Sequence, residues 1–156
     1  MMISIITGNI FNSRTQVIAH QVNCMGVMGA GIAKQIKTRF PDVYDEYVKY
    51  CHVNKGGKLL GDCQLVKSES GRYIANLFGQ YNFSMYHIST SYPAIEHALK
   101  NLKTIMQLNH LDTLAIPYGM SCGLAGGDWW IISDLINEIF NNSSINVQIW
   151  NLKKEK

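Results

Sequence analysis

The chain has 156 residues, of which 47% are hydrophobic, 10% aromatic and 16% charged. This size and composition suit one folded globular domain and exclude a disordered chain, so we expect a single domain over residues 1–156. The net charge is only +3, and no run of like charges marks a nucleic-acid or membrane surface. We expect a monomer that has neither a nucleic-acid nor a membrane partner.

The four cysteines are scattered along the chain without the C-x-x-C spacing of metal or redox motifs. The N-terminus lacks a basic segment followed by an apolar run, and the longest apolar stretches are far shorter than the ~20 residues that a membrane helix needs. We expect free thiols and a cytoplasmic location.

Strand-like and helix-like periodicities follow one another along the whole chain. They predict ten elements in the order β-β-α-α-β-β-α-β-α-β, at residues 3–7, 16–20, 29–40, 41–51, 64–66, 73–78, 93–109, 113–116, 131–140 and 145–150. Gly71 lies in the predicted hairpin turn, and Ser91 and Asp128 are the expected caps of the last two helices. Because helices cross between apolar strands, this order predicts an α/β sandwich with helices on both faces of a mixed sheet.

Two glycine-rich loops each follow a predicted strand and each open a predicted helix, at residues 20–32 and 118–127. Ligands of open α/β sheets bind beyond the carboxyl ends of strands. Glycines let the backbone approach a ligand closely, and helix N-termini favour anions, so the two loops together suit a diphosphate. Tight turns and helix caps explain the glycines equally well from composition alone. Neither a nucleotide P-loop nor a complete G-x-G-x-x-G motif is present.

Polar side chains near these loops are the candidates for chemistry. Asn23 suits hydrogen bonds to a sugar hydroxyl, although an asparagine in a loop often satisfies backbone groups instead. His20 is the best acid–base candidate, although a histidine at a strand end is more often a packed side chain. The other histidines do not cluster with cysteines or carboxylates, so we expect no metal and no cofactor.

Cysteines and aromatic residues in the same region have weaker functional interpretations. Cys24 and Cys122 lie in the loops, but packing is a commoner role for a cysteine than nucleophilic attack. Tyr118, Tyr81 and Phe83 suit the wall of a ligand pocket, and packing in the core is the alternative for each.

Three segments of the chain resemble the ligand-binding segments of macrodomains: Gly8-Asn9-Ile10, the run from Val22 to Ala33, and the run from Pro117 to Trp129. The likeness covers nearly the whole chain and is closest to the branch of ADP-ribose 1″-phosphate phosphatases, which includes small phage-borne members. It implies a three-layer α/β/α fold with a mixed, mostly parallel sheet of about six strands. It also implies ADP-ribose, or a derivative of it, as the small-molecule ligand.

The resemblance assigns binding roles to particular residues. Asn9 takes the place of an aspartate that usually binds the adenine amino group, and Ile10 supplies a backbone contact there. Asn23 matches the asparagine at the distal ribose, and the two loops hold the diphosphate from either side. The ligand-binding set implied by the resemblance is Asn9, Ile10, Gln21, Gly29, Ala30, Gly31, Ile32, Tyr118, Ser121, Cys122, Gly123, Leu124 and Ala125.

The same resemblance bears on catalysis. Some macrodomains remove ADP-ribose from proteins or DNA with a lysine and an acid, and those positions correspond to Gln80 and Ala125 here, which disfavours that mechanism. We therefore expect hydrolysis of the terminal phosphate of ADP-ribose 1″-phosphate, with His20, Asn23 and Asp128 as the catalytic candidates. Two alternatives stay open: a reader or sponge that binds ADP-ribose without turnover, and a hydrolase of ADP-ribosyl esters that uses a bound water.

Overall fold

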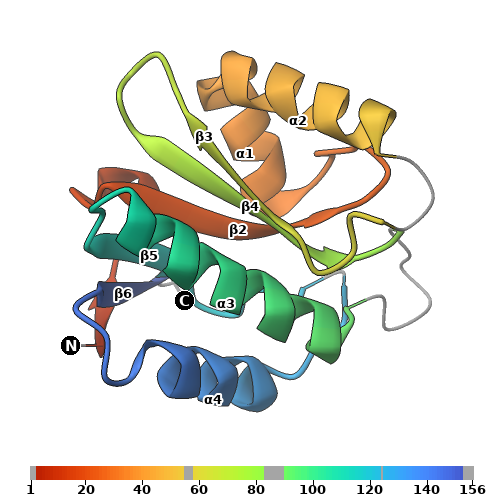
Figure 1. Cartoon of the computed structure of the whole chain (residues 1–156). Coiled ribbons are helices and arrows are strands. Elements are labelled where there is room, and N and C mark those ends of the chain that lie inside the picture. The colour runs from red at the N-terminus through yellow and green to blue at the C-terminus, as the bar shows by residue number, and fades with distance from the viewer. Residues whose placement is uncertain (1–2, 55–57, 83–89, 124, 153–156) are drawn as a thin grey trace.

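The computed structural model describes residues 3–54, 58–82, 90–123 and 125–152, and within them it contains one six-stranded sheet covered by helices on both faces (Figure 1). The predicted order of ten strands and helices is confirmed, and a short 3₁₀ helix, η1, is added. The elements are β1 (Ile3–Thr7), η1 (Ile10–Asn12), β2 (Val17–Asn23), α1 (Gly31–Arg39), α2 (Pro41–Val53), β3 (Cys63–Lys67), β4 (Tyr73–Gln80), α3 (Tyr92–Leu108), β5 (Thr113–Pro117), α4 (Trp129–Phe140) and β6 (Asn146–Asn151).

The strands lie in the order β1-β6-β5-β2-β4-β3. Every neighbouring pair is parallel except β3 with β4, which form the predicted antiparallel hairpin. Helices α1 and α2 pack on one face, and α3 and α4 pack on the other. The expected three-layer α/β/α fold with a mixed, mostly parallel sheet is therefore confirmed.

Strand β2 shows how the sheet separates two hydrophobic cores. Its side chains alternate, so that Val17 and Ala19 join the core beneath α3 and α4 while Ile18 and Val22 join the core beneath α1 and α2. A strand buried on both faces is apolar at successive positions, which explains the unbroken apolar run in this part of the sequence. By the same alternation, the adjacent polar side chains of His20 and Gln21 lie on opposite faces of the sheet.

The end of β2 differs from the prediction. The strand continues to Asn23, three residues beyond the predicted end at His20, because Gln21, Val22 and Asn23 pair with residues of β4. Helix α1 begins at Gly31, two residues later than predicted. The polar residues at the end of β2 are thus held by the sheet and not by a loop.

Local signals at turns and helix ends are confirmed. The Ser91 hydroxyl accepts a hydrogen bond from the backbone N–H of Ala94, and the Asp128 carboxylate accepts one from Trp130. In the hairpin, Gly71 has a φ of 90°, a value that glycine adopts easily. Within the described part of the chain, no helix has the length and apolar character needed to cross a membrane.

Candidate functional site

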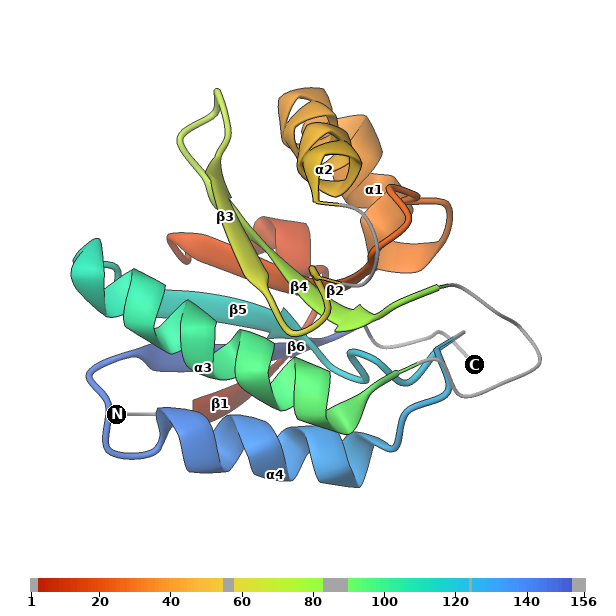
Figure 2. The ribbon, with the colours of Figure 1, turned by 45° about the vertical axis from the view of Figure 1, so that its right-hand side comes forward.

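Three loops leave the sheet at the edge where the parallel strands end. In Figure 2 the loops that follow β2 and β5 both lie at the right-hand side. β1 ends before Gly8 and Asn9, β2 leads through the first glycine loop into α1, and β5 leads through the second glycine loop into α4. Because parallel strands place their carboxyl ends on one side, three segments that are far apart in sequence share this edge. The arrangement brings together the three segments that the sequence singled out.

The first glycine loop ends at the N-terminus of α1, which no side chain caps. Ala30 occupies the N-cap position, and the first turn holds no acidic residue. Gly31 has a φ of 56°, and a Cβ atom added there would have no neighbour within 4 Å among the described residues. This helix end therefore offers N–H groups and partial positive charge next to open space, which suits an anion.

The second glycine loop is held in tight turns. Gly119, Ser121 and Gly126 all have positive φ values between 72° and 76°. The N–H of Gly127 donates to the carbonyl of Ser121, and a Cβ atom on Gly127 would lie 2.5 Å from that oxygen, so only glycine fits there. Like Gly31, Gly123 has open space where a Cβ would stand, whereas Leu124 lies outside the described residues.

Beneath this second loop, Gln21, Thr90 and Ser121 form a closed ring of hydrogen bonds that includes the Ser121 carbonyl, and Gln80 is attached to this ring through Gln21. Ser121 Oγ donates to Gln21 Oε1 at 2.6 Å, and Thr90 Oγ1 donates to the carbonyl of Ser121 at 2.8 Å. Gln21 Nε2 donates to Thr90 Oγ1 at 3.0 Å and to Gln80 Oε1 at 2.8 Å. We call Gln21, Gln80, Thr90 and Ser121 the amide ring. It fixes Ser121, a residue with an unfavourable positive φ, at the end of β2 and β4.

The sequence did not indicate the amide ring. Gly79 was the available signal, because a glycine inside a strand often marks a close approach of another group. A Cβ atom on Gly79 would lie 2.1 Å from Gln21 Oε1, so this glycine makes room for the ring. Gln21 was predicted to bind ligand, but in this structure its amide bonds to protein groups.

Asn23 is buried and supports the first glycine loop. Its Nδ2 donates to the carbonyl of Val27 at 2.8 Å, and its Oδ1 accepts from the N–H of Met25 at 3.0 Å. The Tyr47 hydroxyl also donates to the Asn23 carbonyl at 2.7 Å. Through these contacts Asn23 satisfies backbone groups of the loop, which was the alternative role considered for it from the sequence. Its contact with a ribose stays a prediction.

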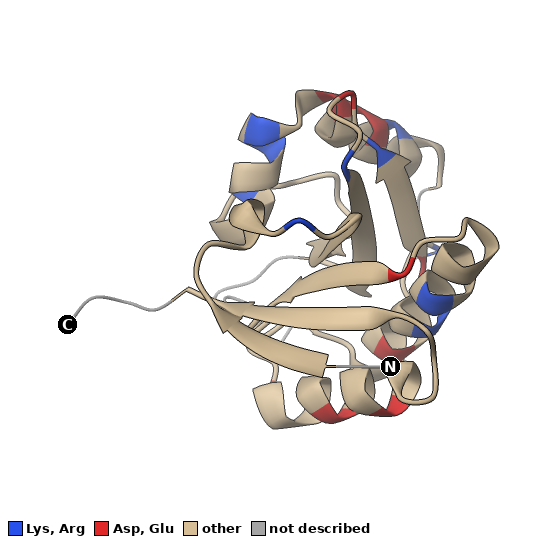
Figure 3. Ribbon diagram, turned by 90° about the vertical axis from the view of Figure 1, so that its left-hand side faces the viewer, with Lys and Arg blue, Asp and Glu red and all other residues tan. Residues whose placement is uncertain are grey.

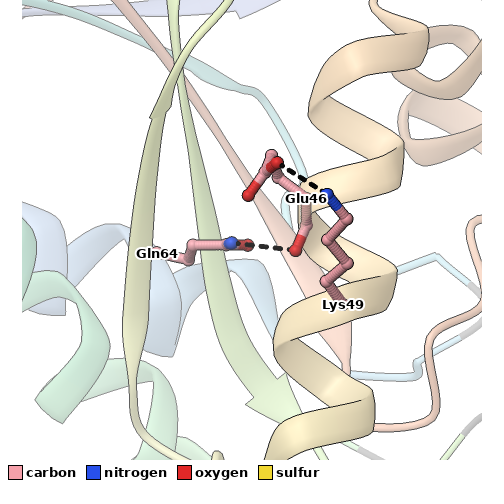
Figure 4. Close-up of polar contacts among 3 residues, drawn as sticks. All are labelled: Glu46, Lys49 and Gln64. Carbon is pink, nitrogen blue, oxygen red and sulfur yellow. Dashed lines mark hydrogen bonds and ion pairs between the residues drawn. The ribbon is translucent and has the colours of Figure 1, made fainter.

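His20 lies within β2 and faces the core beneath α1 and α2. Its imidazole is 2% exposed, and its Nε2 lies 2.7 Å from Asn76 Oδ1. Asn76 Nδ2 donates to Gln64 Oε1, and Gln64 Nε2 donates to the backbone carbonyl of Glu46, whose carboxylate pairs with Lys49 (Figure 4). We call His20, Asn76 and Gln64 the buried polar row.

The surroundings of His20 do not suit the acid–base role predicted for it. Burial lowers its pKa to about 4, and the hydrogen bond to Asn76 only partly opposes that shift. His20 Nδ1 has no hydrogen-bond partner in the described part of the chain. The ring is thus a neutral, packed group, the alternative interpretation of a histidine near a strand end, and the structure supports a structural role for it.

The remaining polar candidates also have local roles. Asp128 caps α4 through Oδ1, and Asn9 Oδ1 accepts a hydrogen bond from the N–H of Phe11 at the start of η1. Burial raises the pKa of the Cys24 and Cys122 thiols to about 11, so both are protonated at neutral pH and poor nucleophiles. Ile10 is buried, which leaves only its backbone for the contact predicted there.

Aromatic residues lie beside the second glycine loop. The Tyr118 ring is 46% exposed, and its centroid lies 4.8 Å from that of Trp129. Tyr81 is also exposed, while Phe83 lies outside the described residues. Tyr118 is therefore exposed beside this loop, and its contact with a ligand stays a prediction. Among the described residues, no group of three or more His, Cys, Asp or Glu side chains is placed to hold a metal ion.

Known proteins resemble this chain over most of its length. A sequence model of the family described as Macro domain matches residues 19–135. A Debaryomyces hansenii protein named ADP-ribose 1″-phosphate phosphatase is 30% identical over 178 residues, a match that covers 95% of this chain and 99% of that protein. A Thermosipho africanus protein named DNA ADP-ribosyl transferase-DNA ADP-ribosyl glycohydrolase fusion protein is 29% identical over 163 residues, and the match covers 95% of this chain.

The chain spans 41% of the length of that fusion protein. Among solved structures, Thermosipho africanus DarTG in complex with ADP-ribose matches with a TM-score of 0.80 and 26% identity. That match covers 99% of this chain and 43% of the other.

Proposed function

The chain belongs to the macrodomain family, and on that premise we propose that it binds ADP-ribose and hydrolyses the terminal phosphate of ADP-ribose 1″-phosphate. The observation that carries the binding proposal is the pairing of two glycine loops at one edge of the sheet, one of which ends at the uncapped N-terminus of α1. The diphosphate of ADP-ribose supplies the negative charge that such a helix end favours.

In the proposed complex the diphosphate lies between Gly29–Ile32 on one side and Ser121, Cys122, Gly123 and Ala125 on the other. The adenine lies near Asn9 and the backbone of Ile10. The distal ribose lies near Asn23, with Tyr118 against the ligand. Open space at Gly31 and Gly123 supports this placement, because a ligand needs to approach the backbone closely at both glycines.

Two observations favour phosphate hydrolysis over glycosidic cleavage. The family resemblance assigns Gln80 to the position of the lysine in lysine-dependent macrodomains, and an amide forms no Schiff base. Its Oε1 is also bonded to Gln21 within the amide ring. The Debaryomyces hansenii relative, 99% of which is covered by the match, is named ADP-ribose 1″-phosphate phosphatase.

In the proposed reaction a water oxygen bonds to phosphorus and the bond from phosphorus to the C1″ oxygen breaks. Inorganic phosphate leaves, and the C1″ oxygen takes a proton to become a hydroxyl. Because His20 is buried and neutral, we assign the role of general base to Asp128, whose Oδ1 caps α4. Asp128 is exposed at the end of the second glycine loop, so its carboxylate is accessible to a water molecule.

Binding without turnover is the second candidate function. It is favoured by the contacts of Gln21 and Asn23, whose side chains are bonded to other protein groups. A reader of ADP-ribose needs the two loops and no catalytic group. A hydrolase of ADP-ribosyl esters would bind its ligand at the same two loops.

Phosphate release from ADP-ribose 1″-phosphate separates these functions. We expect the wild type to release phosphate, and we expect Asp128→Asn, which keeps a side-chain oxygen to cap α4, to release it at least tenfold more slowly while binding ADP-ribose unchanged. Binding of ADP-ribose without phosphate release would leave the reader. Phosphate release at the wild-type rate from Asp128→Asn would remove Asp128 from the mechanism.

A further inference from the structure

A hollow lies at the end of the sheet opposite to the glycine loops. Its volume is about 690 Å³, which is within the range of small-molecule sites. It is bounded by η1, the start of β2, the end of α1 and the turn of the β3–β4 hairpin, and its lining residues are Phe11, Thr15, Gln16, Arg39, Phe40, Ser70, Gly71 and Arg72. Figure 3 looks at the molecule from this side, where blue basic segments lie on a helix, a loop and the hairpin.

Two guanidinium groups line this hollow, and neither has a carboxylate partner among the described residues. Ion pairs in that part of the chain join only Lys49 with Glu46 and Lys100 with Glu96. Asp42 and Glu69 are close in sequence to residues that line the hollow, but neither of them lines it. The Asp42 carboxylate instead accepts a hydrogen bond from the backbone N–H of Glu69. The lining thus carries two positive charges and no negative charge.

The arginines are held in place by their neighbours. The Arg39 guanidinium lies over the Phe11 ring, with 4.3 Å between the guanidinium carbon and the ring centroid. The Phe40 ring lies beside Phe11, with their centroids 6.4 Å apart. Stacking on a ring orients a guanidinium and leaves the N–H groups at its edge free for hydrogen bonds.

Arg72 is fixed from the hairpin side. Its Nη1 donates to Ser13 Oγ at 3.2 Å, and its Nη2 donates to the Ser13 carbonyl. Burial lowers the pKa of Arg72, which nevertheless stays charged. A partly buried, charged guanidinium without a carboxylate partner gains from an anionic ligand, because an oxyanion satisfies its remaining donors.

We propose that this hollow is a second binding site, which takes a small organic molecule that carries an oxyanion, a phosphate or a carboxylate. Arg39 and Arg72 hold the oxyanion, and the aromatic pair Phe11 and Phe40 contacts the body of the ligand. Paired arginines suit planar or tetrahedral oxyanions because their N–H groups form parallel bonds to two oxygens. None of its lining residues belongs to the two glycine loops, although Phe11 directly follows Asn9 and Ile10, near which the adenine is proposed to lie.

The proposal is tested by nuclear magnetic resonance of the whole chain with three aromatic probes: phenyl phosphate, benzoate and benzyl alcohol. The Nε–H signals of Arg39 and Arg72 report directly on the hollow. We expect saturable shifts of both signals with phenyl phosphate, benzoate or both, and none with neutral benzyl alcohol. The comparison of the first two probes identifies which oxyanion the site takes.

Variants give the second arm of the test. Arg39→Gln removes an exposed guanidinium and is expected to weaken probe binding at least tenfold, measured on the Arg72 signal. Arg14→Gln is the matched control, because Arg14 is exposed nearby but does not line the hollow, and it should leave the affinity unchanged. Arg72→Gln removes the second guanidinium and should also weaken probe binding, measured on the Arg39 signal. Arg72→Lys keeps the charge at the hairpin if Arg72→Gln fails to fold.

Three results would overturn the proposal. These are the absence of a saturable shift with either anion, equal binding of benzyl alcohol, or an equal loss of affinity in Arg14→Gln and Arg39→Gln. Equal loss would mean that the probes respond to net charge and not to this hollow.

Discussion

The two ends of the central sheet face open space with different chemistry. At the carboxyl end, Gly31 and Gly123 present backbone next to open space, and the nearby side chains of Gln21 and Asn23 are bonded to other protein groups. At the opposite end, Arg39 and Arg72 present charged side chains. Recognition through backbone depends on loop shape, whereas recognition through arginine depends on charge, so different substitutions should damage the two ends.

The largest effect is expected from a carboxylate placed in the proposed ADP-ribose cleft. Gly31→Glu puts negative charge at the N-terminus of α1, where the diphosphate is proposed to lie, and should weaken ADP-ribose binding at least a thousandfold in calorimetry. Gly71→Glu is the matched control, because Gly71 also has a positive φ and open space around it but lies at the other end.

Both variants place a glutamate side chain at a positive φ, so the comparison tests where along the sheet the carboxylate lies. Gly71→Glu should bind ADP-ribose like the wild type and lose the oxyanion probes. An equal loss of ADP-ribose affinity in the two variants would mean that the cleft has been misplaced.

The next effect concerns the buried polar row, which lies within the sheet and belongs to neither end. The pKa of His20 is about 4 in the fold against 6.5 in an unfolded chain. The unfolded chain therefore takes up a proton first, and the free energy of unfolding should fall by about 3 kcal/mol as the pH drops from about 6.5 to about 4, with no further loss from His20 below that.

Chemical denaturation of the wild type and of His20→Gln at several pH values measures this loss. The substitution should remove most of the pH dependence in that window and leave the rate of phosphate release at pH 7 unchanged. A large fall in the rate of phosphate release by a folded His20→Gln variant would show that His20 takes part in catalysis.

A smaller effect is expected from the amide ring. Gln21→Leu removes the acceptor of Ser121 Oγ and a donor to Thr90, so the second glycine loop should lose its fixed shape. We expect ADP-ribose affinity to fall about tenfold. Gln64→Leu is the control in the buried polar row: it should lower stability without changing affinity. Similar affinities for both variants would show that the amide ring does not position the loop.

The sequence predicted the fold well because its evidence is local. The apolar run in β2 and the helical spacing in α3 depend on residues that are close in the chain, and the shared edge of the two glycine loops follows from parallel strands. The amide ring was missed because Gln21 bonds to residues 59, 69 and 100 positions away. His20 was assigned to the site for a similar reason, since its partner Asn76 is 56 residues distant.

The central claim is that ADP-ribose lies across the two glycine loops, and an amide chemical-shift titration of the wild type with ADP-ribose tests it most directly. The account predicts saturable shifts at Gly31, Ile32, Gly123 and Ala125, and no shift at Gly71. No saturable shift, or shifts confined to the end that carries Gly71, would contradict it.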